Sequence, residues 1–466
     1  MDYVIQQGTL CLEGEHFQAD LTIRNGMIWA IGQTVHTGSE QVIDGRGKYV
    51  CPGGIDAHTH MDLQQSPQYR ACDTFYTGGI AAACGGTTTI LDHMAFGPKG
   101  CSLRAPFETY KKLAADCPVD YSFHGVLQQV DEAVLQELGR LIDEGFPSFK
   151  AYTTYGYPMT EPQLMAVFPV IKAHQGLLTV HAENDGMTNY LRDHLPADAV
   201  VPAGQAVTRP NMAEASSVSM VLATARICGD APVYIVHVSA HESLEQVRLA
   251  RRLGQENIFI ETCPHYLLLT EEKFRSGGPL EGIKYMMAPP LRQAVDNEAL
   301  WQGLRDGSIQ VVATDHCPFT IAEKQEHVAD FRTCPGGVSG VEERMPLLFS
   351  EGVLNGRISL ERFVQVTSAN AAKVFGIYPH KGTLQPGSDA DIVLIDPQRQ
   401  RTFAAENLHT ACGYSPYEGM TTDCVIDTVW LRGQIIARNN EFTGERGYGR
   451  LLHRYGRAPY EEIVNA

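Results

Sequence analysis

Paired cysteines, an excess of positive charge and long apolar runs are all missing from this sequence. Twelve cysteines are present, but no C-x-x-C pair occurs, so neither a zinc ribbon nor a thioredoxin-type redox site is expected. Lys and Arg number 37 against 54 Asp and Glu, and the net charge of -17 argues against nucleic acid or an anionic membrane surface as a partner. No apolar run approaches the ~18 residues that a membrane helix needs.

The first ten residues, MDYVIQQGTL, also lack the basic and apolar regions of a signal peptide. The cysteines are scattered singly, and some, such as Cys84 and Cys263, lie within apolar segments, as reduced core thiols do. These features together predict a chain that works in the reducing cytoplasm.

The phosphate-binding fingerprint of dinucleotide folds is absent as well. Gly53-Gly54 and Gly85-Gly86 lack the G-x-G-x-x-G spacing, which counts against the alternative of a doubly wound open sheet. Strand-like and helix-like segments alternate instead, and the length of 466 residues fits a (β/α)8 barrel of roughly 250 or more residues plus a smaller unit. The eight predicted strands are residues 55–60, 87–92, 120–126, 148–152, 177–181, 233–239, 258–263 and 309–315.

Both ends of the chain are rich in predicted β-strands. Asn25-Gly26 and Arg432-Gly433 have the composition of tight hairpin turns. We therefore predict a composite β-sandwich from residues 1–51 and 377–440, with the barrel inserted over residues 52–376. Two separate small β units are the alternative.

The C-terminal tail, residues 441–466, is basic in an acidic protein. It carries Arg446, Arg450, Arg454 and Arg457. This charge pattern indicates either a contact with another subunit or a solvated tail.

Side chains that can bind metal stand at the ends of several predicted strands. They are His58, His60, Lys150, His181, His237 and Asp315. Because parallel barrel strands present their C-terminal ends to one rim, these side chains can converge on one point. Imidazoles with one carboxylate and one lysine resemble the ligand set of a two-metal hydrolase.

Each of these residues also has an ordinary structural interpretation. His58 and His60 point the same way from a strand, but among 17 histidines roughly one H-x-H pair is expected by chance. His181 and His237 alone would be read as core histidines. Asp315 would form a buried salt bridge. The order of all six along the chain favours the metal site.

Lys150 needs a separate explanation, because a cationic lysine cannot bind a metal. A desolvated amine beside cations is expected to lose its proton. A neutral amine that captures carbon dioxide becomes a carbamate, which then acts as a bridging carboxylate. The alternative is a lysine whose stem is buried while its charge reaches water.

Taken with their flanking residues, these motifs resemble the cyclic amidohydrolases of the hydantoinase and dihydropyrimidinase family, and within it the bacterial D-hydantoinases of the phenylhydantoinase type. The resemblance covers nearly the whole chain. It rests on the six candidate ligands and on PGGIDAHTH (52–60), GGIAAACGGTT (78–88), APPLR (288–292), GVEER (340–344) and GTLQPGSDAD (382–391).

The resemblance implies a site with two divalent metals, usually zinc. His58, His60 and Asp315 would hold one ion, His181 and His237 the other, and Lys150 would bridge them as N6-carboxylysine, formed with CO2 or bicarbonate. Hydroxide activated by two cations would attack the ring amide. The product would be an N-carbamoyl amino acid, and family members form homodimers and homotetramers.

The resemblance also implies roles for residues around the metals. Asp315 would pass a proton from the attacking water to the leaving nitrogen, and Tyr155 would donate to the developing oxyanion. Ala288 and Gly336 stand where the family usually has serine and often asparagine, and they would bind the ring edge through backbone groups. The remaining predicted contacts, which suit a bulky aromatic 5-substituent, are Leu63, Tyr152, Tyr157 and Met159.

Other functions share this ligand set. A dihydropyrimidinase opening dihydrouracil is the first alternative, and an allantoinase is the second. A dihydroorotase is disfavoured because Asp62 stands where those enzymes usually carry an arginine for the substrate carboxylate. A non-enzymatic scaffold protein is disfavoured because all six candidate ligands are present.

Overall fold

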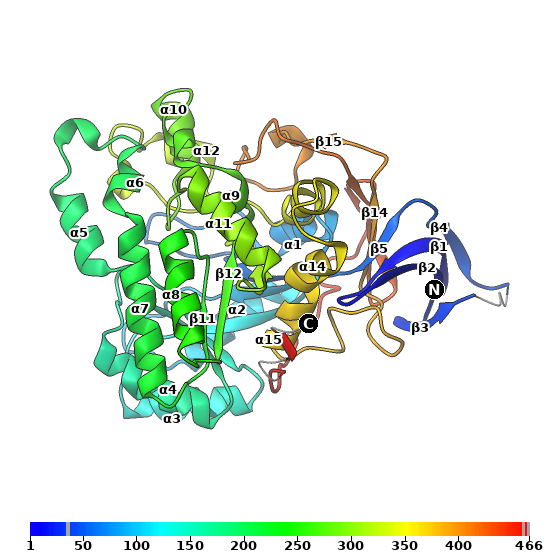
Figure 1. Ribbon diagram of the computed structural model, residues 1–466, viewed down its shortest axis with the longest axis horizontal. Coiled ribbons are helices and arrows are strands. Elements are labelled where there is room, and N and C mark those ends of the chain that lie inside the picture. The colour runs from blue at the N-terminus through cyan, green and yellow to red at the C-terminus, as the bar shows by residue number, and fades with distance from the viewer. Residues whose placement is uncertain (34–37, 459–461, 464–466) are drawn as a thin grey trace.

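The computed structural model describes residues 1–33, 38–458 and 462–463 of the chain. Helices surround a barrel in one part of the molecule, and the N-terminal strands lie beside late strands in the other (Figure 1). No helix among the described residues is both long and apolar enough to cross a membrane.

Eight parallel strands form the barrel and are hydrogen-bonded in chain order. The ring closes where Thr59 bridges His316 and the backbone N–H of His60 donates to the carbonyl of His316 at 2.9 Å. The predicted (β/α)8 architecture is confirmed. The strands are β6 (Gly54–Thr59), β7 (Thr87–His93), β8 (Asp120–Val126), β9 (Ser148–Tyr152), β10 (Leu177–His181), β11 (Val233–Ile235), β12 (Ile258–Thr262) and β13 (Val311–Val312).

Two of these strands are shorter than the sequence predicts. We expected β11 to continue to residue 239 and β13 to residue 315, but they end at Ile235 and Val312. His237 has φ 40° and Asp315 has φ 52°, in the left-handed region that an extended strand excludes. Both side chains therefore project from turns that follow their strands directly.

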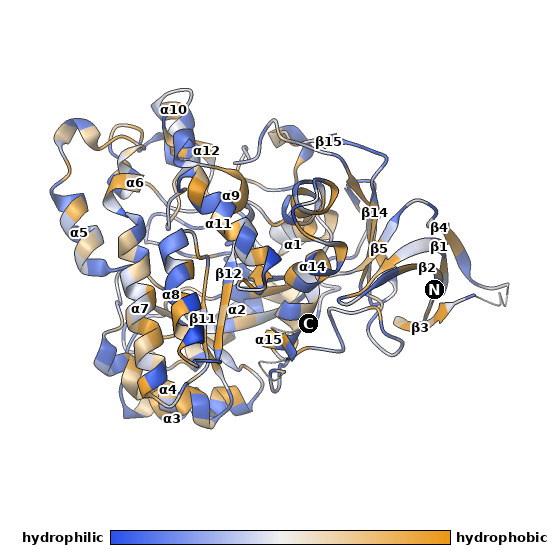
Figure 2. Cartoon of the chain, viewed as in Figure 1, coloured by the Kyte–Doolittle hydropathy of each residue, from blue (hydrophilic) through white to orange (hydrophobic). Residues whose placement is uncertain are grey.

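Helices cover the outside of the barrel. Helix α3 (Glu132–Asp143) begins directly after Asp131, which is its N-cap and accepts from the backbone N–H of Val134. Bands of orange and blue along these helices show apolar and polar residues interleaved (Figure 2), as expected when one face packs on the barrel and the other meets water. The main helices are α1 (Phe75–Cys84), α2 (Arg104–Leu113), α3 (Glu132–Asp143), α4 (Glu161–Ala173), α5 (Asp185–Asp193), α6 (Gly204–Thr208), α7 (Asn211–Ile227), α8 (His241–Arg252) and α11 (Ala294–Arg305).

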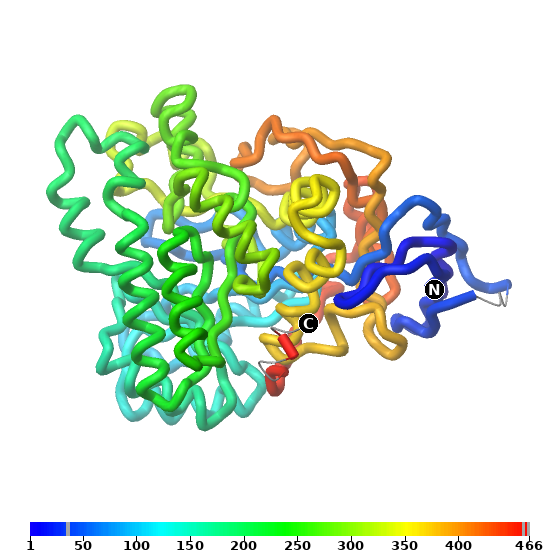
Figure 3. The backbone as a smooth tube through the Cα atoms, in the orientation of Figure 1, coloured from blue at the N-terminus to red at the C-terminus, as the bar shows by residue number. Residues whose placement is uncertain are grey.

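One sheet joins the two ends of the chain, as the blue and the orange to red segments of the tube indicate (Figure 3). N-terminal β5 pairs antiparallel with C-terminal β14 and parallel with β1, so the two ends do not form separate units and the composite architecture is confirmed. The strand order is β19 (Glu441–Phe442), β18 (Gln434–Arg438), β17 (Val425–Leu431), β14 (Ile392–Asp396), β5 (Tyr49–Pro52), β1 (Tyr3–Cys11), β2 (His16–Arg24) and β3 (Met27–Gly32), with β4 (Gln41–Asp44) beside β1.

The two predicted hairpin turns are present and pack against each other. Asn25 and Gly26 have φ 51° and 80°, and Arg432 and Gly433 have φ 45° and 73°, which is the pattern of type I′ turns. A Cβ at Gly26 would lie 2.9 Å from the carbonyl oxygen of Arg432. Glycine is thus required there both by backbone conformation and by the close approach of the second turn.

A buried charge cluster ties the barrel to this sheet. Lys381 contacts Asp120, the first residue of β8, at 2.6 Å, and it also contacts Asp391 at 2.7 Å and Asp389 at 2.9 Å. Arg432, in the turn after β17, pairs with the same Asp120. The cluster links two domains through side chains that lie away from water. We name it the interdomain clamp.

The described part of the C-terminal tail packs on its own barrel. The N–H of Tyr121 donates to the carbonyl of Arg450, and the N–H of Leu452 donates to the carbonyl of Tyr121. Buried Arg454 donates to the hydroxyls of Ser122 and Ser148, near the N-terminal ends of β8 and β9. Residues 459–461 and 464–466 of the predicted tail lie outside the described residues, and its contact with another subunit stays a prediction.

Candidate active site

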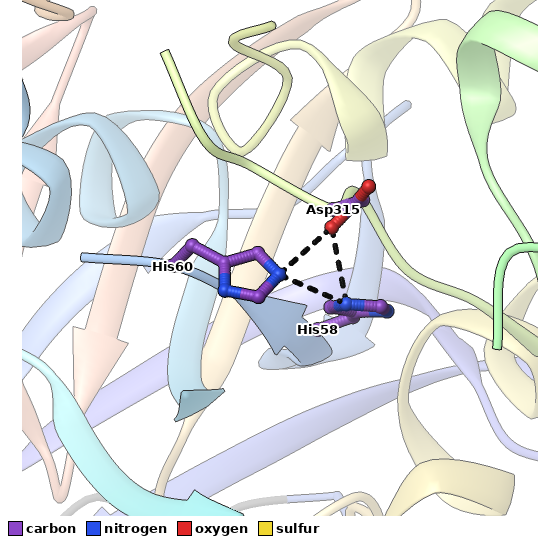
Figure 4. Close-up of side chains that lie close together, drawn as sticks. All are labelled: His58, His60 and Asp315. Atoms are coloured by element: carbon purple, nitrogen blue, oxygen red, sulfur yellow. Dashed lines mark hydrogen bonds and ion pairs between the residues drawn. The ribbon is translucent and has the colours of Figure 1, made fainter. Parts of the chain in front are cut away.

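Three of the candidate ligands meet at the closure of the barrel. The Nε2 atoms of His58 and His60 lie 3.2 Å apart, and Oδ1 of Asp315 lies 3.0 Å and 3.1 Å from them (Figure 4). All three residues offer their ligand atoms within 4.8 Å of one another. Two imidazoles and a carboxylate facing one point form a donor set suited to a divalent metal ion.

Buried hydrogen bonds determine which imidazole nitrogen of His58 faces this point. Its Nδ1 contacts the carboxylate of Glu261, which also accepts from the Tyr234 hydroxyl at 2.8 Å and from the His237 backbone N–H at 3.2 Å. Nε2 is therefore left with its lone pair toward Asp315 and His60. A carboxylate behind an imidazole is the usual support of a metal-binding histidine.

Lys150 lies next to this group. Its Nζ is 3.4 Å from Nε2 of His58, and the side chain is buried. Burial lowers the pKa of Lys150 to about 8, although Asp315 and Glu261 act in the opposite direction. A larger fraction of Lys150 is therefore in the neutral amine form that carboxylation requires than for an exposed lysine.

His181 and His237 complete the gathering of the six predicted residues. Their ring centroids are 4.5 Å apart, and the His237 ring stacks 5.4 Å from that of His58. Nε2 of His181 contacts Oε2 of Glu183 at 2.8 Å, which leaves Nδ1 of His181 for another partner. The donor set of five ligands around a lysine fits two divalent ions.

The backbone is strained at three of the predicted site residues. Tyr155, His237 and Asp315 have φ 71°, 40° and 52°, which costs an L-residue of order 1–3 kcal/mol each. Such strain persists only where the surrounding structure enforces it. Here it turns the three side chains toward a common space.

That space is a cavity of about 550 Å³ at the C-terminal ends of the strands. The candidate ligands form part of its lining, together with predicted residues Leu63, Tyr152, Tyr155, Tyr157, Ala288 and Gly336. Met159 is the exception: it is buried in the hydrophobic core and does not line the cavity.

Two of the lining residues that the sequence analysis did not name contact predicted aromatic residues. Phe96 packs 5.4 Å from the ring of Tyr152 and 4.8 Å from that of Tyr157, and it could have been found because it follows the end of β7 by three residues. Arg209 lies over the ring of Tyr155 at 5.2 Å. Its position between α6 and α7 matches no strand end, so the sequence pattern held no signal for it.

His93 was also missed. It ends β7, and its ring lies 4.2 Å from that of His58. Neither of its nitrogens has a hydrogen-bond partner among the described residues. Burial, together with the nearby Lys150, holds the pKa of His93 well below its usual range, so this imidazole is neutral.

The backbone at Ala288 and Gly336 is fixed by side chains around the cavity. Gln65 donates to the carbonyl of Gly336 at 2.8 Å and accepts from its N–H at 3.2 Å. Buried Lys324 donates to the carbonyls of Met286 at 2.9 Å and Gly337 at 2.6 Å. One ammonium group thus holds the two segments that flank the predicted ring-binding positions.

Asp62, which distinguishes this chain from dihydroorotases, is already engaged. Its carboxylate pairs with Arg70 at 2.7 Å and accepts from the N–H of Phe75, the first residue of α1, at 3.0 Å. The position therefore offers no cation to a substrate carboxylate.

Comparisons with known proteins agree with this geometry. The family model described as "Amidohydrolase family" matches residues 49–436. A D-phenylhydantoinase of Escherichia coli O7:K1 is 43% identical over 461 residues, which is 97% of this chain and 98% of that protein. The crystal structure of a dihydropyrimidinase from Brevibacillus agri has a TM-score of 0.95 at 38% identity and covers 98% of this chain and 100% of its own. The D-hydantoinase from Bacillus sp. AR9 has a TM-score of 0.94 at 36% identity, with the same coverage. The chain therefore belongs to the amidohydrolase family, among the hydantoinases and dihydropyrimidinases, as its motifs predict.

Proposed function

We propose that this protein hydrolyses the cyclic amide bond of 5-substituted hydantoins and releases N-carbamoyl amino acids. One observation carries the proposal: six candidate ligands and an aromatic wall line a single cavity of about 550 Å³. The similarity to a D-phenylhydantoinase and to D-hydantoinases supports it.

In this proposal the site holds two zinc ions. His58, His60 and Asp315 would hold one, His181 and His237 would hold the other, and Lys150, carboxylated by CO2, would supply a further carboxylate to the same site. The fit rests on the short distances between donor atoms and on the buried amine of Lys150. When bound, such ions lower the pKa of water into the neutral range and polarise a carbonyl.

The protein's own groups then move the protons. Asp315 accepts the proton of the attacking water and delivers it to the ring nitrogen as the C–N bond breaks. Tyr155 donates its hydroxyl hydrogen to the carbonyl oxygen as negative charge develops there. Glu261 and Glu183 hold the imidazoles of His58 and His181 in orientation.

The cavity wall favours an aromatic 5-substituent. Tyr152, Tyr157 and Phe96 pack as a cluster, with Leu63 also in the lining, and aromatic rings prefer such edge and offset contacts. The backbone groups of Ala288 and Gly336 bind the ring edge. Met159 lies in the core, so we assign it no substrate contact.

The test is to compare ring-opening rates of 5-phenylhydantoin, dihydrouracil and allantoin with protein loaded with zinc and bicarbonate. Fastest turnover of the phenyl compound is expected. Fast dihydrouracil turnover with slow phenylhydantoin turnover would make the enzyme a dihydropyrimidinase, as the similarity to the Brevibacillus agri enzyme also allows. Preference for allantoin would contradict the aromatic pocket. Lys150→Ala is the control and should lose both metal and activity. A scaffold protein would have neither metal nor activity even in its wild-type form.

We also propose that the chain forms a homotetramer or homodimer. Met187 and Tyr190 on α5 and Met212 on α7 are exposed apolar side chains, which single chains seldom leave in number on neighbouring helices. Light scattering of the purified protein would contradict this proposal if it gave the mass of one chain, 51.2 kDa.

A further inference from the structure

Arg209 bridges Glu183 and the predicted oxyanion donor Tyr155, which lie on different segments. Its Nη1 donates to Oε2 of Glu183, and its guanidinium carbon lies 5.2 Å from the centroid of the Tyr155 ring. The side chain is largely buried at the cavity wall, and Glu183 is fully buried. One cation therefore contacts both a carboxylate and an aromatic face.

The same carboxylate oxygen of Glu183 contacts Nε2 of His181 at 2.8 Å. The ring of His181 in turn lies 4.9 Å from that of Tyr155. Arg209, Glu183, His181 and Tyr155 thus form a closed cycle of contacts. A shift in any one of them disturbs both neighbours.

Tyr155 depends on this cycle for its placement. Its backbone is strained at φ 71°, it is 42% exposed, and its hydroxyl has no hydrogen-bond partner among the described residues. Ring contacts with Arg209, His181 and Tyr152 are what orient the phenol.

Arg209 is itself held firmly. Its carbonyl accepts from Nη1 of Arg292, whose Nη2 pairs with buried Glu214 at 3.1 Å. Its N–H donates to the carbonyl of Gln205 at 3.2 Å. The guanidinium is therefore a fixed support rather than a mobile surface cation.

We propose that Arg209 is a positioning residue that holds the phenol of Tyr155 and, through Glu183, the imidazole of His181 at one side of the cavity. This inference rests on the proposed function in that Tyr155 is taken as the oxyanion donor. Arg209 itself transfers no proton.

Arg209→Lys is the decisive variant. It keeps the positive charge but lacks the planar guanidinium, which can stack on a ring and bind a carboxylate at the same time. We expect kcat for 5-phenylhydantoin to fall about tenfold to hundredfold, the effect of misplacing a catalytic group by about 1 Å. KM should change by less than about threefold, because the lost interaction acts in the transition state.

Measuring the effect of Arg209→Lys in both the wild-type and the Tyr155→Phe protein distinguishes the loss of Tyr155 positioning from general damage to the fold. In a Tyr155→Phe protein the further loss from Arg209→Lys should shrink to a few-fold, because the hydroxyl that Arg209 positions is gone while the lysine ammonium can still pair with Glu183 behind His181. Arg401→Lys is the matched control, because Arg401 is a similarly buried arginine that pairs with Glu342 and lies over the Phe403 ring, away from Arg209 and Tyr155. Its effect on kcat should be equal in both backgrounds.

A second measurement does not depend on activity. In protein labelled with 3-fluorotyrosine, the ¹⁹F resonance of Tyr155 is assigned by its absence from Tyr155→Phe. Arg209→Lys should shift or broaden this resonance, and Arg401→Lys should not. An unchanged resonance, or a full loss of kcat that persists in the Tyr155→Phe background, would overturn the inference. If the wild-type protein opens no cyclic ureide, the proposed function fails, and the resonance alone decides the role of Arg209.

Discussion

Single residues in the cavity divide into those that touch the reacting groups and those that hold them. Tyr155 is the clearest member of the first kind, because its hydroxyl has no partner among the described residues and its ring is fixed from several sides. Tyr155→Phe should lower kcat by about 10²–10³, the usual cost of losing an oxyanion donor. Metal content measured by plasma mass spectrometry should stay at the wild-type level. Loss of metal together with activity would show that Tyr155 supports the ligands instead.

The aromatic wall gives a prediction about the preference between two substrates rather than about the rate with one of them. Tyr152→Ala should reduce kcat/KM for 5-phenylhydantoin relative to dihydrouracil by about tenfold, because an aromatic contact and apolar burial are lost. Met159→Leu is the control and should leave the ratio unchanged, since Met159 packs in the core. The two ratios are obtained from parallel assays of each variant. An unchanged ratio in Tyr152→Ala would refute the pocket assignment.

Glu343 gives a pH-dependent prediction. Burial, reinforced by Glu342, raises the pKa of Glu343 from 4.5 to about 7. In the folded protein this carboxyl keeps its proton at pH values where the unfolded chain has already lost it, so stability falls as pH rises from about 4.5 through 7. The full effect is about 3 kcal/mol above pH 8.

Glu343→Gln removes this titration while its amide oxygen can still accept from Ser415, as the carboxyl does at 2.7 Å. Urea unfolding at pH 5.5 and 8.5 should therefore show a smaller loss of stability with pH in the variant than in the wild type. Equal losses in the two proteins would contradict the raised pKa.

Among the secondary-structure elements, the interdomain clamp joins the start of β8 to the turn after β17 through Lys381, Asp120 and Arg432. Removing one partner of a buried ion pair leaves an uncompensated charge, so Lys381→Met should lower the free energy of unfolding by about 3–5 kcal/mol. Lys48→Met is the control. Its pair with Asp427 is closer to the surface, and the loss should be about 1 kcal/mol or less.

The pKa values of the clamp residues set the pH range over which Lys381→Met lowers the stability of the protein. Burial alone would raise the pKa of Asp120, but Lys381 and Arg432 lower it overall, so its contribution is lost as pH falls below about 4. The three aspartates raise the pKa of Lys381 despite its burial, so its contribution persists until pH rises above about 10. Thermal unfolding of wild type and Lys381→Met should differ most between these limits and converge in acid. A difference that is constant down to pH 3 would speak against the pairing.

Element positions were predictable where periodicity governs them. The bounds of β8, β9 and β10 agree with the sequence prediction because apolar runs, glycine and N-caps mark them. β11 and β13 were predicted too long. The residues before His237 and Asp315 stay apolar, and no residue type there marks the left-handed backbone that ends each strand. Phe96 and Arg209 were missed, and Met159 was placed in the pocket, because loop conformation decides which side chains reach a cavity.

At the scale of the whole molecule, the barrel and the composite sheet were both predictable from pattern and turn chemistry. The docking of Arg454 under the barrel was not, since a basic tail looks the same in sequence whether it packs on its own chain or on another.

Three of the candidate ligands, His58, His60 and Asp315, also lie at the closure of the barrel, where β6 meets the segment after β13. Removing divalent metal with a chelator should therefore loosen this closure before the rest of the barrel. Hydrogen exchange followed by mass spectrometry should show faster exchange at residues 54–60 and 311–316 than at β8, which carries none of the candidate ligands. Uniform protection in the metal-free protein would contradict the prediction.

Because the barrel closes where early and late parts of the chain meet, this closure also limits when the fold can be completed during synthesis. His58 and His60 leave the ribosome early, but Asp315 follows only after all eight barrel strands, and β5 must wait still longer for β14. Neither the metal-binding group nor the composite sheet can form on a partly made chain. The nascent protein must therefore leave one edge of β5 and one edge of β6 unpaired until β14 and the segment around His316 are made, which exposes it to aggregation during that interval. The full set of candidate ligands exists only once all eight barrel strands have been made.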